Sequence, residues 1–268
     1  MRVTQGLRAA LVTGASSGIG EAFAQALAAR GTSLLLAARS EDRLRALAND
    51  LAARHDLRVE VVPVDLADRD GPRRLQAAAD ERGFEPDLVV NNAGLGRLGR
   101  FVEGPLERQL EMVHLNVEAL VALTGLYLPR MVARRSGAIL NVASTAAFQP
   151  LPHFAVYAAS KAFVMSFSAA LWAEHRRDGV RVMALCPGPV ADTRFGEGGA
   201  KESRFFHDVR AMPREAVVEY ALRALDHNKP IATPGLSNRL IGLAVNAFPR
   251  RLQLTLSEHM FRRRANEE

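Results

Sequence analysis

Short apolar runs alternate with longer helix-forming segments along most of the chain, and this alternation limits the fold more than any other feature. The runs are apolar throughout, which is typical of parallel strands covered by helices on both faces. The segments between them carry apolar residues at the spacings of three and four that mark an amphipathic helix. We therefore predict a doubly wound α/β fold, with a mostly or wholly parallel sheet of about seven strands and helices on both faces. The expected strands cover residues 9–13, 33–38, 58–64, 87–91, 137–143, 180–186 and 230–233, and the expected helices cover 18–30, 40–54, 68–82, 106–135, 154–177 and 213–227.

The domain organisation follows from the length and from the lack of a low-complexity linker or an internal repeat, so we expect residues 1–268 to form one domain. Residues 188–212 are rich in Gly, Arg and Phe, fit no regular element, and are long enough for a functional loop such as a substrate lid. Residues 236–268 are expected to form a helical C-terminal extension. Its amphipathic runs end in arginines, so it could rest on a membrane surface or pack on a lid or a second subunit, and packing is the favoured interpretation.

The composition excludes several classes of protein. A hydrophobic content of 48% with 24% charged residues is ordinary for a globular enzyme. The net charge of +6 comes almost wholly from arginines scattered over the expected helices, so a nucleic-acid partner is not expected. The single cysteine, Cys186, excludes an internal disulfide, and the seven histidines show no metal-ligand spacing. The start does not resemble a signal peptide, and no apolar run approaches the ~18 residues that span a bilayer, which predicts a cytoplasmic protein without firm membrane association.

A glycine-rich turn, Gly14-Ala-Ser-Ser-Gly-Ile-Gly20, follows the first expected strand and opens the first expected helix. Glycines allow a tight turn and let backbone N–H groups approach a pyrophosphate, which also favours the positive N-terminal end of a helix. The position in the first strand–helix unit favours dinucleotide binding over a turn without a ligand. The expected cofactor contacts in this turn are Gly14, Ser16, Ser17, Gly18, Ile19 and Gly20.

The end of the second expected strand indicates which dinucleotide is bound. An acidic residue at this point binds the ribose 2′-hydroxyl of NAD, whereas an arginine accommodates the 2′-phosphate of NADP. The strand ends at Arg39, and no acidic residue occurs before Glu41. Because a guanidinium binds phosphate bidentately and a carboxylate repels it, Arg39 favours NADP(H) over NAD(H) as the cofactor.

Tyr157 and Lys161 are four residues apart on an expected helix and therefore share one face. An ammonium near a phenol favours the phenolate and would lower the tyrosine pKa from its ordinary value near ~10. Such a tyrosine can exchange a proton with an alcohol or a carbonyl oxygen, and Ser144 would be a second donor to that oxygen. Taken alone, the pair is more typical of an aromatic ring packed on an exposed lysine stem.

Together, these motifs resemble the compact one-domain branch of the short-chain dehydrogenase/reductases over approximately residues 8–235. The resemblance rests on Thr13-Gly-Ala-Ser-Ser-Gly-Ile-Gly20, Asn91-Asn-Ala-Gly94, Asn116, Ser144, Tyr157-x-x-x-Lys161 and Pro187-Gly188, in that order. It implies a Rossmann-type fold with the nicotinamide beside the tyrosine. It adds as cofactor contacts Asp65 and Leu66 near the adenine, then Asn92, Ala93 and Gly94 along the channel, and Pro187, Gly188, Val190 and Thr193 near the nicotinamide. Thr193 comes one residue later than the usual threonine, with Asp192 in its place.

The resemblance also implies a mechanism. In the reduction, a hydride leaves the nicotinamide for a carbonyl carbon while Tyr157 donates a proton to the oxygen. Ser144 would hold that oxygen, and Lys161 would lower the tyrosine pKa and bind the nicotinamide ribose. Asn116 resembles the asparagine that keeps a water in a proton relay to the lysine. The implied catalytic residues are Asn116, Ser144, Tyr157 and Lys161, and no metal is required.

The sequence therefore predicts an NADP(H)-dependent oxidoreductase that interconverts a small carbonyl compound and a secondary alcohol. A non-catalytic dinucleotide-sensing regulator on the same sheet is the alternative. A sugar-nucleotide epimerase or dehydratase is a third possibility, but it requires a larger C-terminal domain than this chain has room for. Residues 94–103, 145–156 and 188–212 are expected to form the substrate pocket. Their apolar residues favour an apolar substrate, although ligand pockets are apolar in general. We also expect a homo-oligomer, either a dimer or a tetramer.

Overall fold

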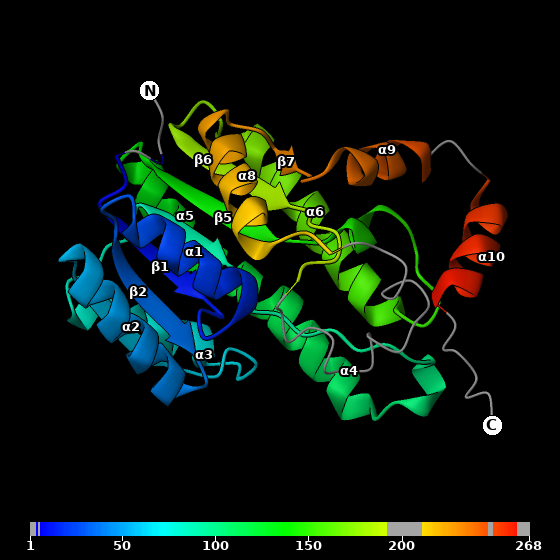
Figure 1. Ribbon diagram of the computed structural model, residues 1–268, viewed down its shortest axis with the longest axis horizontal. Coiled ribbons are helices and arrows are strands. Elements are labelled where there is room, and N and C mark those ends of the chain that lie inside the picture. The colour runs from blue at the N-terminus through cyan, green and yellow to red at the C-terminus, as the bar shows by residue number, and fades with distance from the viewer. Residues whose placement is uncertain (1–3, 5, 192–210, 246–248, 262–268) are drawn as a thin grey trace.

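One parallel sheet forms the centre of the computed structural model, which describes residues 4, 6–191, 211–245 and 249–261 (Figure 1). Within these residues the strand order is β3-β2-β1-β4-β5-β6-β7, and every neighbouring pair is parallel. The order reverses between β1 and β4, which is the switch point of a doubly wound sheet. This confirms the predicted Rossmann-type fold. The strands are β1 (Ala9–Thr13), β2 (Ser33–Ala38), β3 (Val59–Pro63), β4 (Leu88–Asn91), β5 (Gly137–Val142), β6 (Val180–Leu185) and β7 (Ile231–Ala232).

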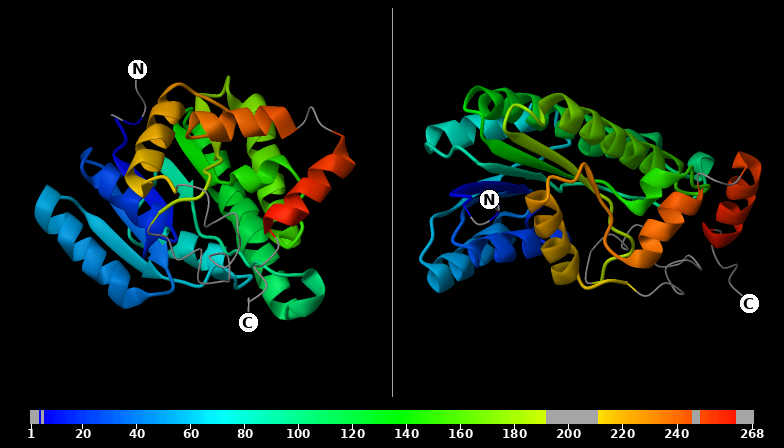
Figure 2. Two further views of the ribbon diagram at one scale, coloured as in Figure 1. Left: turned by 45° about the vertical axis from the view of Figure 1, so that its right-hand side comes forward. Right: turned by 90° about the horizontal axis from the view of Figure 1, so that it is seen from above.

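Helices cover both faces of the sheet, as Figure 2 shows from above. One face carries α1 (Gly18–Ala28), α2 (Glu41–His55) and α8 (Arg214–Asp226), and the other carries α3 (Gly71–Glu81), α5 (Ala119–Ala133) and α6 (Ala155–His175). Successive side chains of a strand point to opposite faces, so Leu11 and Val12 of β1 enter different apolar cores. Both directions are buried, which is why these strands are apolar throughout.

The expected helix over 106–135 is wrong in one respect, because a π-helical turn interrupts it. The structure has α4 (Leu106–Val113), then the π-helical turn η3 (His114–Glu118), then α5. Asn116 lies in the middle of this turn and hydrogen-bonds to the backbone of Leu95. Turns of this kind are rare and occur often at functional sites. The interruption follows from a tertiary contact that the apolar periodicity of the segment does not reveal.

Short helices and a C-terminal arm complete the described chain. The 3-10 helices η2 (Phe101–Glu103) and η4 (Thr145–Phe148) lie in the loops after β4 and β5. Beyond β7, α9 (Leu236–Val245) and α10 (Arg250–Phe261) extend away from the sheet (Figure 1). By length and mean hydropathy, though not as unbroken apolar runs, Leu106–Ala133 and Ala155–His175 could each cross a membrane. Both segments contribute buried side chains to the packing described above, and core helices pass the same test.

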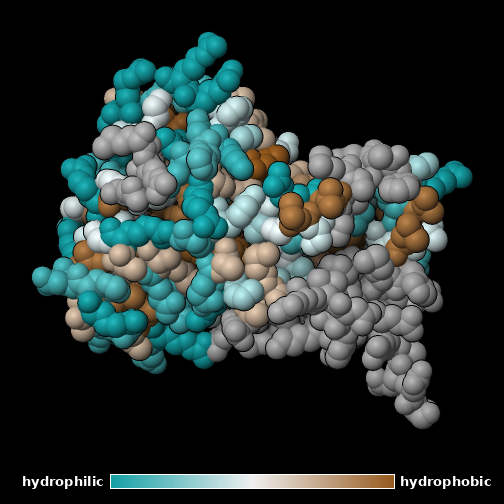
Figure 3. Space-filling model, turned by 45° about the horizontal axis from the view of Figure 1, so that its top comes forward, coloured by the Kyte–Doolittle hydropathy of each residue, from teal (hydrophilic) through white to brown (hydrophobic). Residues whose placement is uncertain are grey.

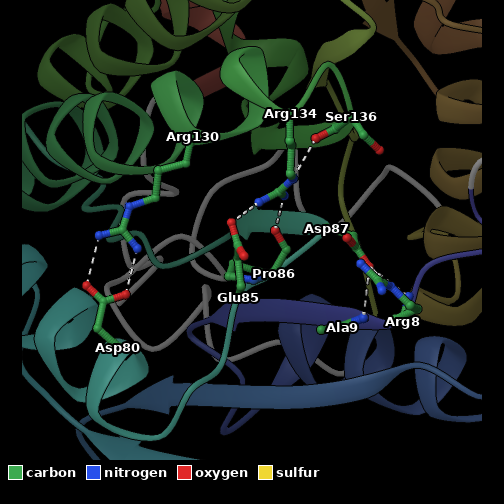
Figure 4. A network of polar contacts seen from close by, with 9 residues as sticks. All are labelled: Arg8, Ala9, Asp80, Glu85, Pro86, Asp87, Arg130, Arg134 and Ser136. Carbon is green, nitrogen blue, oxygen red and sulfur yellow. Dashed lines mark hydrogen bonds and ion pairs between the residues drawn. The ribbon is translucent and has the colours of Figure 1, made fainter.

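A polar network closes the edge of the sheet at which β1 and β4 begin (Figure 4). The carboxylate of Asp87 accepts hydrogen bonds from the backbone N–H groups of Arg8 at 2.8 Å and Ala9 at 3.3 Å. Between α3 and α5, Arg130 donates two hydrogen bonds to Asp80, at 2.6 and 2.8 Å. Arg134 adds bonds to the side chain of Glu85 and to the backbone carbonyls of Pro86 and Ser136. This network holds the edge of the sheet opposite the carboxyl ends of the strands.

Candidate active site

The predicted cofactor residues follow the carboxyl ends of neighbouring strands. The glycine turn follows β1, Arg39 follows β2, and Asn92–Gly94 follow β4. Because the carboxyl ends of parallel strands meet at one edge of the sheet, the fold brings these segments to the switch point, where open α/β sheets bind ligands. At the same edge, Asp65 and Leu66 follow β3, and Pro187, Gly188 and Val190 follow β6. Thr193 lies outside the described residues.

The turn after β1 has the geometry of a phosphate-binding turn. Gly14 has a φ of 64° and Gly18 a φ of 59°, in the left-handed region that favours glycine. A Cβ atom on Gly20 would lie 2.3 Å from the carbonyl oxygen of Gly14, so only glycine fits there. Ser17 precedes α1 in an extended conformation, and its side chain does not cap the helix. The hydroxyl of Ser17 therefore leaves the first N–H groups of α1 uncapped. An anion at the helix N-terminus requires such N–H groups as hydrogen-bond donors.

Thr13 and Asn92 connect this turn to the end of β4. The hydroxyl of Thr13 accepts hydrogen bonds from the backbone N–H groups of Asn92 and Ala93, both at 3.0 Å, and donates to the carbonyl of Val90 at 3.2 Å. The side-chain amide of Asn92 returns a bond of 2.9 Å to the carbonyl of Thr13. Asn92 therefore holds the two loops together. Thr13 was not among the predicted contacts, although its place in the motif beside Gly14 was a usable signal.

Arg39 lies between two carboxylates. Its Nη1 atom is 3.8 Å from Asp65 Oδ2 and 3.8 Å from Glu111 Oε1, and its side chain is 60% exposed. Asp65 also accepts a hydrogen bond of 2.9 Å from the backbone N–H of Ala67. The predicted residues Arg39 and Asp65 are thus neighbours. Glu111, on α4, was missed because nothing in the sequence relates it to the end of β2.

The side chains of Tyr157 and Lys161 lie one turn apart on α6, as predicted, and both are buried. The lysine Nζ is 5.8 Å from the centroid of the phenol ring and donates a hydrogen bond of 2.8 Å to the carbonyl of Val142. Ser144 lies two residues beyond the end of β5 and is hydrogen-bonded to Tyr157. The structure therefore brings together the predicted phenol, hydroxyl and ammonium.

Burial dominates the ionisation of these groups. It raises the pKa of Tyr157 to about 12, and the hydrogen bond with Ser144 offsets only part of that increase. It lowers the pKa of Lys161 to about 8 and raises the pKa of the neighbouring Cys186 thiol to about 12. The net shift of the tyrosine pKa is therefore opposite to the predicted direction, because desolvation outweighs the hydrogen bond with Ser144 that lowers the pKa. A phenol of this pKa is protonated at neutral pH and can donate a proton.

Asn116 is 1% exposed, and its side-chain amide is fully engaged. Its Oδ1 accepts from the N–H of Leu95 at 2.8 Å, and its Nδ2 donates to the carbonyl of Leu95 at 2.9 Å and to Ser160 Oγ at 3.0 Å. Ser160 in turn donates to the carbonyl of Tyr157 at 2.7 Å. Asn116 therefore connects the loop after β4 to α6, which carries Tyr157 and Lys161. Sequence reasoning missed Ser160, and its place directly before Lys161 was the available signal.

Gly94 lies against both Asn116 and Lys161. A Cβ atom at this position would be 3.1 Å from Asn116 Oδ1 and 3.4 Å from Lys161 Nζ. The contact with Asn116 would be tighter than most Cβ contacts in proteins, whereas the contact with Lys161 would be an ordinary van der Waals contact. Glycine at this position therefore leaves the side chain of Asn116 undisturbed. The loop after β4 thus brings a predicted cofactor contact beside two predicted catalytic residues.

The turn after β6 is held from two sides. The carbonyl of Pro187 accepts a hydrogen bond of 2.9 Å from the N–H of Thr145 at the start of η4. A Cβ atom on Gly188 would lie 2.7 Å from Nδ2 of Asn238 in α9. Val190 forms a parallel bridge with Met212, which brings together the two ends of the predicted lid. The lid itself, apart from residues 188–191 and 211–212, lies outside the described residues.

Apolar side chains surround the phenol of Tyr157. Leu98, Leu151 and Phe154 form one buried cluster with it, and the ring of Phe154 meets the tyrosine ring edge to face at 5.1 Å. Leu98 and Leu151 come from two of the three segments predicted to line the substrate pocket. Of the other apolar residues in those segments, Phe195, Phe205 and Phe206 lie outside the described residues.

Comparison with known proteins decides the family. The family described as short chain dehydrogenase matches residues 8–202, which is more than half of the chain. The chain belongs to this family. Members of the short chain dehydrogenase family are NAD(P)-dependent oxidoreductases. The predicted resemblance is confirmed, and the glycine turn, Ser144, Tyr157 and Lys161 lie within the matched region.

Among curated relatives of this short-chain dehydrogenase is the very-long-chain 3-oxoacyl-CoA reductase of Anas platyrhynchos, 36% identical over 187 residues. The match covers 68% of this chain and 59% of that protein, so the chain spans about three fifths of the relative's length. Among solved structures, a short-chain dehydrogenase from Sphingobium yanoikuyae in complex with NADPH is 32% identical, with a TM-score of 0.79 over 90% of this chain and 94% of that one. L-sorbose reductase from Gluconobacter frateurii, complexed with NADPH and L-sorbose, is 29% identical, with a TM-score of 0.75 over 87% and 96% of the two chains.

Proposed function

We propose that this short-chain dehydrogenase interconverts a carbonyl compound and a secondary alcohol with NADP(H), and that Tyr157 exchanges the proton. The observation that carries the proposal is the meeting of three groups at the carboxyl edge of the sheet. Tyr157 is hydrogen-bonded to Ser144, and Lys161 lies one turn further along α6. A buried phenol with a second donor and a fixed cation is suited to acid–base chemistry at an oxygen atom.

The cofactor fits the residues at this edge. The tight turn at Gly14 and Gly20 leaves room for backbone N–H groups to meet a pyrophosphate. When bound, NADP(H) supplies or accepts the hydride. The residues that would hold it are the predicted contacts, of which Thr193 alone lies outside the described residues: Gly14, Ser16, Ser17, Gly18, Ile19, Gly20, Arg39, Asp65, Leu66, Asn92, Ala93, Gly94, Tyr157, Lys161, Pro187, Gly188, Val190 and Thr193.

The protein's own residues manage the proton. In reduction, Tyr157 donates its hydroxyl proton to the carbonyl oxygen, which Ser144 also holds by a hydrogen bond. The ammonium of Lys161 stabilises the phenolate that forms, and the interaction is strengthened because both groups are buried. Asn116 fixes the loop after β4 against α6, so that the lysine and the tyrosine keep their spacing. In oxidation, each transfer runs in reverse.

The preference for NADP(H) over NAD(H) is supported by Arg39, which is exposed at the end of β2. Two of the solved relatives hold NADPH, which agrees with the same preference. The nearby carboxylates of Asp65 and Glu111 oppose a 2′-phosphate, so the guanidinium must turn from them to bind it.

The partners follow from surfaces near the site. The cluster of Leu98, Leu151 and Phe154 around the tyrosine supports an apolar carbonyl substrate. Leu106, Leu110 and Val113 of α4 are exposed apolar residues, which supports a homo-oligomer. The cytoplasmic location stays a prediction.

Consumption of NADPH over a panel of ketones, aldehydes, quinones and acyl thioesters tests the proposal, with NADH as the comparator. We expect turnover of at least one apolar carbonyl class, faster with NADPH. A protein that binds NADPH but turns over no compound, and whose Tyr157→Phe variant binds NADPH equally well, would instead be a dinucleotide sensor. Equal rates with both nucleotides would contradict the role of Arg39.

A further inference from the structure

The C-terminal arm, which we define as α9 and α10, exposes leucines along its outer surface. On α9, Leu236 is 76% exposed and Leu240 is 65% exposed, and on α10, Leu252 and Leu256 are 45% and 56% exposed. Figure 3 shows exposed hydrophobic residues, in brown, in separate small groups on this side of the molecule. Single exposed leucines are ordinary on a protein surface, but a set on two consecutive helices marks a contact surface.

Positive charge accompanies these leucines. Residues 234–268 contain six arginines and three glutamates. Their net charge of +3 is half of the net charge of +6 of the whole chain. Arg239, Arg250 and Arg251 form no ion pair with any described residue. Glu258 is the single acidic residue within α9 and α10. The arm is therefore both apolar and cationic.

The inner side of the arm touches the candidate active site. A Cβ atom on Gly242 of α9 would lie 2.9 Å from the ring of Phe148, in the loop after β5. Asn238 of α9 lies against Gly188, in the turn after β6. The leucine surface is therefore the outer side of a helix whose inner side borders the substrate and cofactor loops.

We propose that the C-terminal arm docks on a bilayer that contains anionic lipids. The leucines enter the boundary between headgroups and acyl chains, and the arginines pair with the lipid phosphates. A two-fold contact with a second copy would bring the arginines of one arm against those of the other, which charge repulsion opposes. Docking in this orientation places α9 between the lipid and the substrate loops, so that, on the proposed function, an apolar carbonyl compound from the membrane has only to pass one helix to reach them. This reverses the expectation of no firm membrane association.

Vesicle flotation of the full-length protein tests the docking directly. We expect co-flotation with vesicles in which about a quarter of the phosphatidylcholine is replaced by phosphatidylglycerol, and much weaker binding to pure phosphatidylcholine. A basic residue near an anionic surface contributes about fivefold to binding, about 1 kcal/mol, so Arg250→Glu with Arg251→Glu should lower the partition coefficient about 25-fold or more. High salt should weaken binding in the same direction.

Matched variants separate the arm from the rest of the surface. Leu252→Glu with Leu256→Glu should abolish vesicle binding. The controls Val121→Glu on α5 and Arg177→Glu change an exposed valine and an exposed arginine outside the arm and outside the predicted substrate segments, and should bind as the wild type does. All variants should keep the wild-type melting temperature and the wild-type rate with a water-soluble carbonyl compound.

The outcomes are distinct. Wild-type protein that stays with the soluble fraction overturns the proposal, as do arm variants that float like the wild type. If the leucine variants instead halve the mass in solution and vesicles bind neither protein, the arm is a subunit contact. Because flotation requires no turnover, its result tests the docking proposal even if the carbonyl panel shows no activity.

Discussion

The ammonium of Lys161 donates a hydrogen bond of 2.8 Å to the backbone carbonyl of Val142, the last residue of β5. The lysine of α6 is thereby fixed over the strand end that leads to Ser144. Burial lowers its pKa to about 8, because an ammonium loses hydration when it leaves water. Burial of the Lys161 ammonium therefore costs free energy, and that cost depends on pH.

That cost predicts how the stability of the cofactor-free protein changes with pH. The unfolded chain holds the Lys161 proton up to its ordinary pKa of 10.5, whereas the folded protein releases it near 8. Between these values the unfolded state binds more protons, so the contribution of Lys161 to the free energy of unfolding rises with pH. The free energies of unfolding of the wild type and of Lys161→Met can be compared by urea unfolding across this pH window. As the pH rises, the free energy of unfolding of the wild type should increase relative to that of the variant. Cys186 and Tyr157 titrate in both proteins and largely cancel, so a flat difference contradicts the prediction.

Ser160 is predicted to position Asn116. Ser160→Ala removes the hydroxyl that accepts from Asn116 and donates to the carbonyl of Tyr157. We expect kcat to fall about tenfold to a hundredfold, because small displacements of reacting groups are costly, with little change in the KM for NADPH. The free energy of unfolding should fall by about 1–2 kcal/mol. Ser160→Thr keeps the hydroxyl and should recover most of the rate, whereas a loss of stability with unchanged kcat would make Ser160 merely structural.

Gly20 is predicted to tolerate no side chain. In Gly20→Ala the new Cβ would lie 2.3 Å from the carbonyl oxygen of Gly14. We therefore expect the free energy of unfolding to fall by about 1–3 kcal/mol or more, and the cofactor to bind more weakly. Gly125→Ala is the matched control, because no atom lies within 4 Å of its added Cβ. As a helix-interior change it should stabilise the protein by about 0.5–1 kcal/mol. Calorimetric melting temperatures that move in the same direction for both variants would refute the close approach.

Arg39 and Glu111 are predicted to set the choice of cofactor in opposite directions. Arg39→Ala should raise the Kd for NADPH about 10-fold to 100-fold and leave the Kd for NADH unchanged, because a charge-assisted contact to the 2′-phosphate is lost. Glu111→Gln should tighten NADPH binding several-fold, because one of the two carboxylates near the guanidinium loses its charge. Fluorescence titration with both nucleotides measures these effects. An equal loss for both nucleotides in Arg39→Ala would contradict the assignment.

The fold could be predicted largely from local pattern. The bounds expected for β1 and β2, 9–13 and 33–38, are those of the structure, because strands buried on both faces are unbroken apolar runs. The π-helical turn at Asn116 could not be predicted, since the apolar spacing continues through 106–135. The turn depends on hydrogen bonds between Asn116 and Leu95, which only the folded chain brings together.

The site was predictable where its motifs are contiguous and not where it depends on contacts across the chain. The glycine turn and the pair Tyr157 and Lys161 carry their geometry in their spacing. The ion pair between Arg39 and Glu111 forms between elements that have no relation in the sequence. The direction of the tyrosine pKa shift was missed because spacing gives the distance to a charge but not the depth of burial.

Single-turnover reduction by Tyr157→Phe tests the central claim most directly. The variant keeps the ring that packs on Phe154 and removes only the hydroxyl, so its fold and its Kd for NADPH should match those of the wild type. With a carbonyl compound that the wild type reduces, the rate should fall by about 10²-fold to 10⁴-fold, the usual contribution of a positioned proton donor. A variant that binds NADPH normally and reduces the compound at the wild-type rate would contradict the role of Tyr157 as the proton donor.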